Sequence, residues 1–234
     1  ASDSLGAVSL IENPQLSDIS ALASLTHLDV LRVNNMPMLT SLDGFSNITT
    51  IGDIFLFNDT GLINLYGLHN ITSISRSIFI MQQPFADLSG LENVVSIGHM
   101  SISDNANLTS LNGIQSLQYL TGSAVVPDTS ALTLSRNPLL KDISVLNRLT
   151  SLGGSVTIEK CESLKNLHGL EGVTSVEGGM RFIQNDSLET LGALSNVTSI
   201  GVARLAIPGS SSPLSFLVSG NAVLKDVGIR AVQT

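Results

Sequence analysis

Four aspartates recur at one position of an internal repeat, and their type and spacing suit chemistry better than those of any other residues. Glycoside hydrolysis needs two carboxyl groups about 5 to 10 Å apart, and some repeat proteins cleave acidic polysaccharides with clustered carboxylates. None of the four has another member in an adjacent turn, and the intervening turns carry Ser, Asn or Thr at that position. We therefore interpret Asp18, Asp87, Asp142 and Asp226 as solvated turn residues and predict a protein without catalytic activity.

Metal and cofactor motifs are the next candidates. His27, His69, His99 and His168 do not show the spacing of metal ligands, and the sequence contains no calcium-binding nonapeptide, P-loop or dinucleotide fingerprint. We expect neither a metal nor a cofactor. The single cysteine, Cys161, cannot form an internal disulfide and is interpreted as a partly buried small residue rather than a reactive thiol.

Charge and hydropathy argue against two further classes of protein, nucleic-acid-binding and membrane-spanning proteins. The formal net charge is −8, and the 11 basic residues are scattered, which argues against a nucleic-acid partner. No apolar stretch approaches the roughly 18 residues that cross a bilayer, so we expect no transmembrane segment. Because neither end resembles a signal peptide or an anchor tail, we expect a mature or excised segment.

An internal repeat of about 23 residues organises the chain. Its leading apolar residue recurs at steps of 23, 23, 23, 23, 32, 24, 24 and 36 residues. The series predicts about nine turns. Its members are Leu16, Leu39, Leu62, Phe85, Leu108, Leu140, Leu164, Leu188 and Leu224.

Two periodicities within each turn define the elements. After the leading residue, apolar residues recur every third position, as at Leu39, Leu42 and Phe45, which fits neither a helix nor a long strand. Before it, apolar residues alternate, as at Leu31 and Val33, which predicts a strand. Glycines at fixed offsets, such as Gly44 and Gly67, fit tight corners. These signals predict a mainly β, right-handed parallel β-solenoid.

We expect one indivisible repeat domain over residues 1–234, because a single turn cannot bury its own apolar edge. The two long steps place insertions near residues 121–131 and 201–215, just ahead of a strand. Both insertions should bulge along one edge, either as binding segments or as tolerated loops.

The pattern Leu-x-x-Leu-x-Gly, followed by Asn-Ile-Thr-x-Ile-Gly in residues 39–52 and nearly repeated in residues 188–201, resembles the receptor L domain. That leucine-rich repeat family includes the L domains of insulin and epidermal growth factor receptors and related fungal and protist cell-surface proteins. The resemblance implies a β-helix fold and an extracellular or cell-surface location. It does not imply receptor signalling, since flanking cysteine-rich modules are absent from the sequence.

The strand register predicts an apolar contact surface. Counting from the leading residues makes Phe55, Phe57, Ile78 and Ile80 point outward on neighbouring strands. Exposed apolar patches of this kind mark contact sites, so these residues are the predicted partner-binding residues, for a protein partner or for self-association. The alternative is that an N-terminal extension or an insertion of the same chain covers them.

The sequence contains six N-glycosylation sequons, which predict a secreted glycoprotein if the chain passes through a eukaryotic secretory pathway. Three of these asparagines share one repeat offset, where a turn could instead require Asn for side-chain hydrogen bonding. The predicted glycosylation sites are Asn47, Asn58, Asn70, Asn107, Asn185 and Asn196.

Recurring Thr-Thr and Thr-Ser pairs form a possible hydroxyl ladder, interrupted at Val95-Ser96 and Gln118-Tyr119. The ladder keeps a carbohydrate- or ice-surface-binding solenoid as the alternative function, with a polysaccharide-acting enzyme less favoured. The function that the sequence favours is a non-enzymatic extracellular module for protein binding, cell adhesion or structural assembly, as part of a larger glycoprotein.

Overall fold

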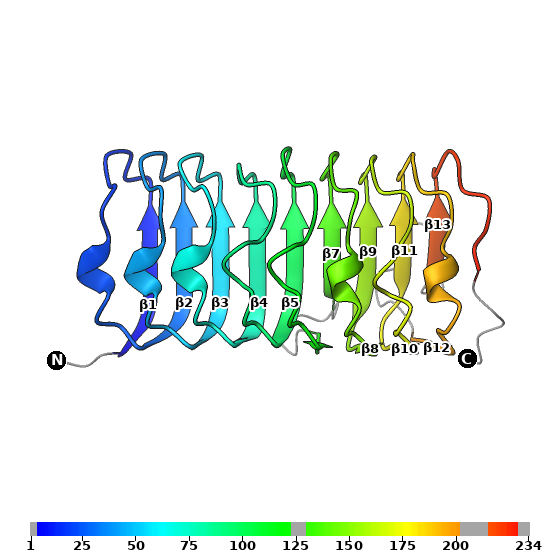
Figure 1. Cartoon of the computed structure of the whole chain (residues 1–234), viewed down its shortest axis with the longest axis horizontal. Helices are drawn as coiled ribbons and strands as arrows, with labels where there is room; N and C mark the ends of the chain where they lie inside the picture. The colour runs from blue at the N-terminus through cyan, green and yellow to red at the C-terminus, as the bar shows by residue number, and fades with distance from the viewer. Residues whose placement is uncertain (1–3, 123–129, 202–214, 229–234) are drawn as a thin grey trace, which may run out of the picture.

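The computed structural model describes residues 4–122, 130–201 and 215–228, which form a parallel β-solenoid with no α-helix. The predicted mainly β solenoid is therefore confirmed. Figure 1 shows the strands standing side by side along the long axis, with β1 toward one end of the solenoid and β13 toward the other. The central parts of both predicted insertions, residues 123–129 and 202–214, lie outside the described residues.

The sheet pairs every strand in parallel with the corresponding strand of the next coil. In the first five coils one strand of eight or nine residues serves the whole coil, and in the last four it is divided into two shorter ones. The strands are β1 (Ser4–Ile11), β2 (His27–Asn34), β3 (Thr50–Phe57), β4 (Ser73–Met81), β5 (Ser96–Ser103), β6 (Tyr119–Leu120), β7 (Ser130–Ser135), β8 (Ser151–Leu152), β9 (Ser155–Glu159), β10 (Ser175–Val176), β11 (Met180–Ile183), β12 (Ser199–Ile200) and β13 (Phe216–Ser219). Nine coils, and hence about eight full turns, lie between β1 and β13.

The period-three segments run back along the other side of each coil. Five of them contain a short 3₁₀ turn, drawn in front of the strands in Figure 1. These turns are η1 (Ser20–Leu22), η2 (Asp43–Phe45), η3 (Tyr66–Leu68), η4 (Ser144–Leu146) and η5 (Gly192–Leu194). None of them is long or apolar enough to cross a bilayer.

The core consists of apolar columns that continue from coil to coil. Each column repeats one position of the coil, so a leucine or isoleucine packs on its equivalent about 4.8 Å away. The leading residues from Leu39 to Leu188 are at most 5% exposed, as the repeat predicts. Gly67 shows why the corner requires glycine, since a Cβ there would overlap the Leu42 carbonyl of the preceding coil.

A residue in the left-handed region directly follows each of β1 to β5, β7, β9 and β11, and this conformation is unusual for side chains other than glycine. Among the described residues, eight that are not glycine have φ between 52° and 59°. The conformation is held by the next coil, because the amide of each donates to the carbonyl at the end of the following strand, as Lys160 N does to Ile183 O at 3.0 Å. The eight residues are Glu12, Asn35, Asn58, Gln82, Asp104, Arg136, Lys160 and Gln184.

The residue after each left-handed position belongs to a ladder along the edge of the core, which is buried from Met36 to Asn185 and consists mainly of polar side chains. In the middle of this ladder, Asn137 Oδ1 accepts the Asn105 backbone amide at 3.0 Å, and Asn137 Nδ2 donates to Ile102 O at 2.8 Å. The side chain therefore bonds to two backbone groups of the preceding coil. The ladder runs through Asn13, Met36, Asp59, Gln83, Asn105, Asn137, Cys161, Asn185 and Asn221.

Candidate functional site

A column of stacked side chains crosses the outward face of β2 to β5. Phe55 and Phe79 are neighbours in the sheet register, and their rings lie parallel, with centroids 5.2 Å apart and an interplanar angle of 5°. The Arg32 guanidinium covers the other side of the Phe55 ring at 4.9 Å from its centroid. The His99 ring meets Phe79 edge-on at 5.2 Å. The column thus runs over four adjacent strands.

The predicted outward placement of Ile78 and Ile80 is wrong. Both side chains are 1% exposed, and the register pairs Ile54 with Ile78 and Leu56 with Ile80, so the two isoleucines belong to the core. The residue between them, Phe79, points outward instead. A one-residue shift of register exchanges the two faces of a strand.

A β-bulge in β4 causes this shift. Between the paired residues Ile74 and Ile78, β4 has three residues where β3 has two between Ile51 and Ile54. The turn after β4 is one residue shorter than usual, because Ile80 to Phe85 spans five residues whereas Leu56 to Leu62 spans six. The overall step of 23 residues to Phe85 is therefore unchanged, and a count from Phe85 misassigns the strand.

The corrected surface is here called the aromatic patch and comprises Phe55, Phe57, Phe79 and Met81. All four side chains are partly exposed, and Phe57 pairs with Met81 in the register. The rings of Phe55 and Phe57 lie 6.2 Å apart, which makes the patch continuous within β3 as well as across the strands. Beyond β5 the outward column continues with small polar residues, Thr133 and Thr157. The apolar surface is therefore confined to two strands.

His99 borders the aromatic patch as a neutral group. Burial lowers the pKa of its imidazole, and its Nε2 atom is buried without a hydrogen-bond partner among the described residues. A ring that is neutral at pH 7 adds an apolar edge to the stack and little charge. Arg32, which is exposed, places a positive charge next to the patch.

Five of the six sequon asparagines are exposed, but Asn185 is not. Asn185 belongs to the buried ladder, is 0% exposed, and donates from Nδ2 to Ile158 O at 2.9 Å. The predicted glycan at Asn185 is therefore wrong for the folded chain, because the amide nitrogen that would carry the sugar is enclosed. The exposed sequon residues are Asn47, Asn58, Asn70, Asn107 and Asn196.

The sequons that share a repeat offset also have a structural reason to carry Asn. Asn47, Asn70 and Asn196 each donate from Nδ2 to a backbone carbonyl of the preceding coil, at 2.6 to 2.8 Å. Asn93, which is not part of a sequon, makes the same bond to His69 O at 2.8 Å. The turn chemistry alone is therefore enough to account for Asn at this offset.

The aspartates at one offset cap turns. Asp18, Asp87, Asp142 and Asp226 each accept a hydrogen bond from the amide two residues later, at 2.8 to 3.0 Å. Ser, Asn and Thr in the other coils accept the same bond, for example Asn166 from the His168 amide. These contacts hold the pKa of Asp18 and Asp142 below the usual range, chiefly through the backbone amide of Ser20 and Ser144 respectively.

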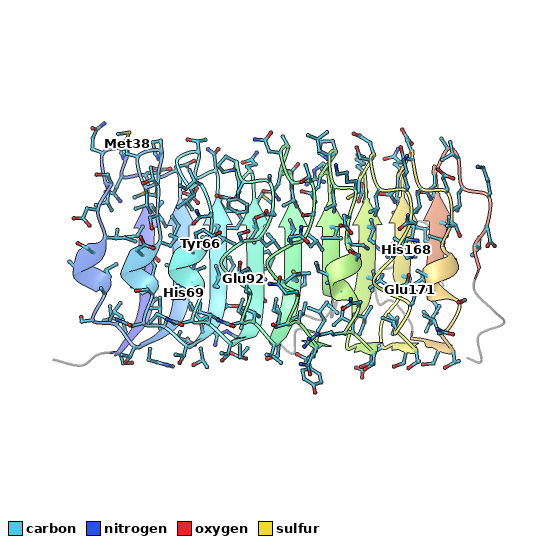
Figure 2. All side chains as sticks on the ribbon, viewed as in Figure 1. Met38, Tyr66, His69, Glu92, His168 and Glu171 are labelled. Atoms are coloured by element: carbon cyan, nitrogen blue, oxygen red, sulfur yellow. The ribbon has the colours of Figure 1, made fainter. Side chains whose placement is uncertain are left out.

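The recurring hydroxyls bond mainly to the backbone. Thr72, Thr174 and Thr198 each donate from Oγ1 to a threonine carbonyl of the preceding coil at 3.2 Å. Histidines do not gather either, since Figure 2 shows His69 and His168 at separate places along the side that carries the 3₁₀ turns. No group of three or more His, Cys, Asp or Glu among the described residues could hold a metal ion.

Comparison with known proteins found no family model that matches the chain and no matching curated protein.

Proposed function

We propose that this chain is a non-enzymatic extracellular or cell-surface module, of the kind that receptor L domains represent, which binds a protein partner through the aromatic patch. The observation that carries the proposal is the stack of Phe55 on Phe79 on the outward sheet face. Large apolar side chains on an open sheet face gain free energy when a partner covers them, roughly 1.5 to 3 kcal/mol for a side chain that becomes fully buried. The half-buried rings here would gain less.

The flanking residues indicate what kind of partner surface fits. Arg32 already stacks on Phe55 and keeps its charge at the edge of the patch. A complementary surface would place apolar or aromatic side chains over Phe57 and Met81 and an acidic group near Arg32, the arrangement of an apolar centre with a polar rim that protein interfaces favour. Parallel strands make this platform rigid, so little conformational entropy is lost on binding.

Site-specific photocrosslinking tests the proposal. A photoreactive residue in place of Phe57 is expected to form an adduct of defined mass in native extracellular material, because position 57 faces the partner. The matched control is the same probe in place of Glu159, which occupies the same outward column four coils further on.

The adduct at position 57 should disappear in the Phe55→Ser and Phe79→Ser double variant, with the circular dichroism spectrum unchanged. An adduct with a second copy of the chain would identify self-association by this face. Equal labelling from positions 57 and 159, or no adduct from either, would count against a partner at the aromatic patch.

A further inference from the structure

A pocket of about 440 Å³ lies on the turns that follow β7, β9 and β11 (Figure 1). Three consecutive coils form it, and the coil of β5 separates them from the aromatic patch on β3 and β4. Within the described part of the chain, its lining has two cations and three neutral polar groups but no carboxylate. The lining residues are Lys141, Ser163, Lys165, Asn166 and Ser187.

Lys141 and Lys165 occupy the same position of neighbouring coils. Each directly follows the leading leucine of its coil, so their backbones lie one strand spacing, about 4.8 Å, apart. Glu189 and Lys225 occupy this position in the next two coils and, having opposite charges, pair at 3.7 Å. Lys141 and Lys165 have like charges, and neither forms an ion pair with a described residue. An anion held between them would supply the missing counter-charge.

The neutral lining residues add hydrogen-bond donors around the same space. Ser163 and Ser187 directly precede the leading leucines of their coils, and both are half-buried. Asn166 Oδ1 accepts the His168 amide at 3.1 Å, which leaves Asn166 Nδ2 as a donor without a partner among the residues that the structure describes. Five side chains from three coils can therefore donate into one pocket.

The carboxylates nearest to the pocket in sequence are either engaged or outside its lining. Glu189 pairs with Lys225, and Asp142 accepts the backbone amide two residues later at 2.9 Å. Glu162 and Asp186 are exposed and do not line the pocket. Their charges oppose the approach of an anion, which sets a sign for one variant below.

We propose that this pocket binds a tetrahedral oxyanion, a sulfate or phosphate group, between Lys141 and Lys165. The two ammonium groups donate to different oxygens, and Asn166 Nδ2 and the two serine hydroxyls donate to the others. Four oxygens in a tetrahedron can accept from donors on three coils, whereas a carboxylate offers two oxygens in one plane. Because exposed ion pairs are individually weak, we expect a dissociation constant of roughly 1 mM for a single ion.

Titration of the ¹⁵N-labelled chain with sodium sulfate tests the proposal by nuclear magnetic resonance. Sodium chloride keeps the ionic strength constant, because salt screens exposed charges. The amide signals of residues 163–166 and of Ser187 should shift and saturate with one dissociation constant. Signals of the aromatic patch should not shift, and the Phe55→Ser and Phe79→Ser variant should bind sulfate like the unmodified chain, so the result is independent of the proposed function.

A pair of charge-matched double variants separates a defined site from general attraction. Lys141→Gln with Lys165→Gln should raise the dissociation constant at least about tenfold, because both counter-charges are lost. Both lysines are exposed, so the thermal midpoint should be unchanged. The matched control, Arg148→Gln with Lys160→Gln, removes the same charge outside the pocket and should leave the constant within about twofold.

Two further variants test direction and sign. Ser163→Ala with Ser187→Ala keeps the net charge and should raise the dissociation constant about threefold, because two donors are lost. Glu162→Gln should lower it, because a carboxylate next to the pocket is removed. Shifts that do not saturate, equal weakening in the charge-matched control, or no effect of the serine variant would overturn the proposal.

Sugar esters distinguish the source of the oxyanion. Glucose 6-sulfate and glucose 6-phosphate are titrated in parallel with the inorganic ions, and glucose is the control. Tighter binding of an ester than of its free ion would identify a sulfated or phosphorylated glycan as the ligand, whereas equal or weaker binding would identify the free ion. Saturable binding of glucose itself would mean that the pocket recognises a sugar and not an oxyanion.

Discussion

The guanidinium of Arg76 pairs with the carboxylate of Asp29 at 2.9 Å, although 47 residues and two coils separate them. Arg76 lies in the bulge of β4, and its Nε also donates to Asp53 Oδ2 at 2.7 Å. The path to Asp29 crosses Gly52, where the absence of a side chain leaves room for the guanidinium. The bulge that shifts the register of β4 therefore also ties three coils together.

Gly52→Ala should destabilise the protein by about 2 kcal/mol, since overpacking of this kind commonly costs about 1 to 3 kcal/mol. A Cβ at position 52 would collide with the Arg76 guanidinium and would approach Asp29 O to 2.6 Å. Urea denaturation of both proteins measures the difference.

Arg76→Ala is the matched control and should cost less, about 1 kcal/mol, because the ion pairs are partly exposed to solvent. Adding Gly52→Ala to Arg76→Ala should still destabilise, because the contact with the Asp29 carbonyl remains. If Gly52→Ala does not lower the free energy of unfolding of the Arg76→Ala variant, then only the Arg76 guanidinium requires glycine at position 52.

Protein stability should fall as the pH rises from about 4 to about 6, because of Asp59. Asp59 is 0% exposed, and desolvation raises its pKa from 3.8 to about 6, against the lowering effect of the amide of Met36 and the side chain of Gln83. A carboxyl group with a raised folded-state pKa is protonated in the folded chain but ionised in the unfolded chain within this window. The contribution of Asp59 to the free energy of unfolding is therefore most favourable below pH 4. It falls by about 1 to 3 kcal/mol as the pH rises above 6.

Asp59→Asn should remove this part of the pH dependence and raise the free energy of unfolding at pH 7. An asparagine at position 59 could donate from Nδ2 to the Val33 carbonyl. Asn105 makes the equivalent bond in the ladder, from Nδ2 to Ile80 O at 3.1 Å. The Gln83 Oε1 atom, which has no hydrogen-bond partner among the described residues, would gain a possible donor. Denaturation midpoints for both proteins between pH 4 and pH 7 measure the effect. If the midpoints of both proteins depend on pH in the same way, groups other than Asp59 cause the pH dependence.

Cys161→Asn should stabilise the protein by about 1 kcal/mol, because the cysteine occupies an amide position of the ladder. Its Sγ lies 3.8 Å from Leu134 O, the carbonyl to which a ladder asparagine would donate from Nδ2. A shift in the thermal midpoint measures the change, with Cys161→Ala as the destabilising control.

The thiol itself should react slowly with iodoacetamide until the protein unfolds. Burial raises the pKa of the Cys161 thiol to about 11, so almost none of it is thiolate at neutral pH. Rapid labelling of the folded protein would show that this edge of the core opens readily.

Chain produced in a eukaryotic secretory host should carry no glycan at Asn185, whatever the occupancy at Asn47, Asn58, Asn70, Asn107 and Asn196. The buried amide of Asn185 is fully used by the ladder, and a sugar there would prevent the coil from closing. Glycopeptide mapping by mass spectrometry reads each site separately. A glycan found at Asn185 in folded material would contradict the buried ladder at that coil.

Most of the fold could be predicted because stacking repeats the same residue type at the same position of each coil. Leu39, Leu62 and Leu108 are 0% exposed, as their spacing requires. The aromatic patch could be predicted only in part, because a bulge and a shortened turn in the fourth coil cancel in the overall period. A comparison of each strand with its two neighbours, instead of with Phe85, would have exposed the extra residue at Arg76.

The buried ladder also leaves a signal in the sequence. An Asn or Asp recurs three residues before the leading leucine, at Asp59, Asn105, Asn137 and Asn185. A polar residue at a fixed distance from a core residue resembles an exposed turn, and at Asn185 it coincides with a sequon. Burial of the side chain depends on the left-handed residue before it, which composition and hydropathy do not reveal.

The continuity of the parallel strands has a mechanical consequence. The strands lie across the solenoid axis. A force applied along that axis would therefore break the hydrogen bonds between one pair of coils at a time. Each coil that detaches would release about 23 residues, or roughly 75 to 80 Å of extended chain. The molecule would then lengthen in similar steps from either end at modest force and could absorb strain without losing all of its core at once.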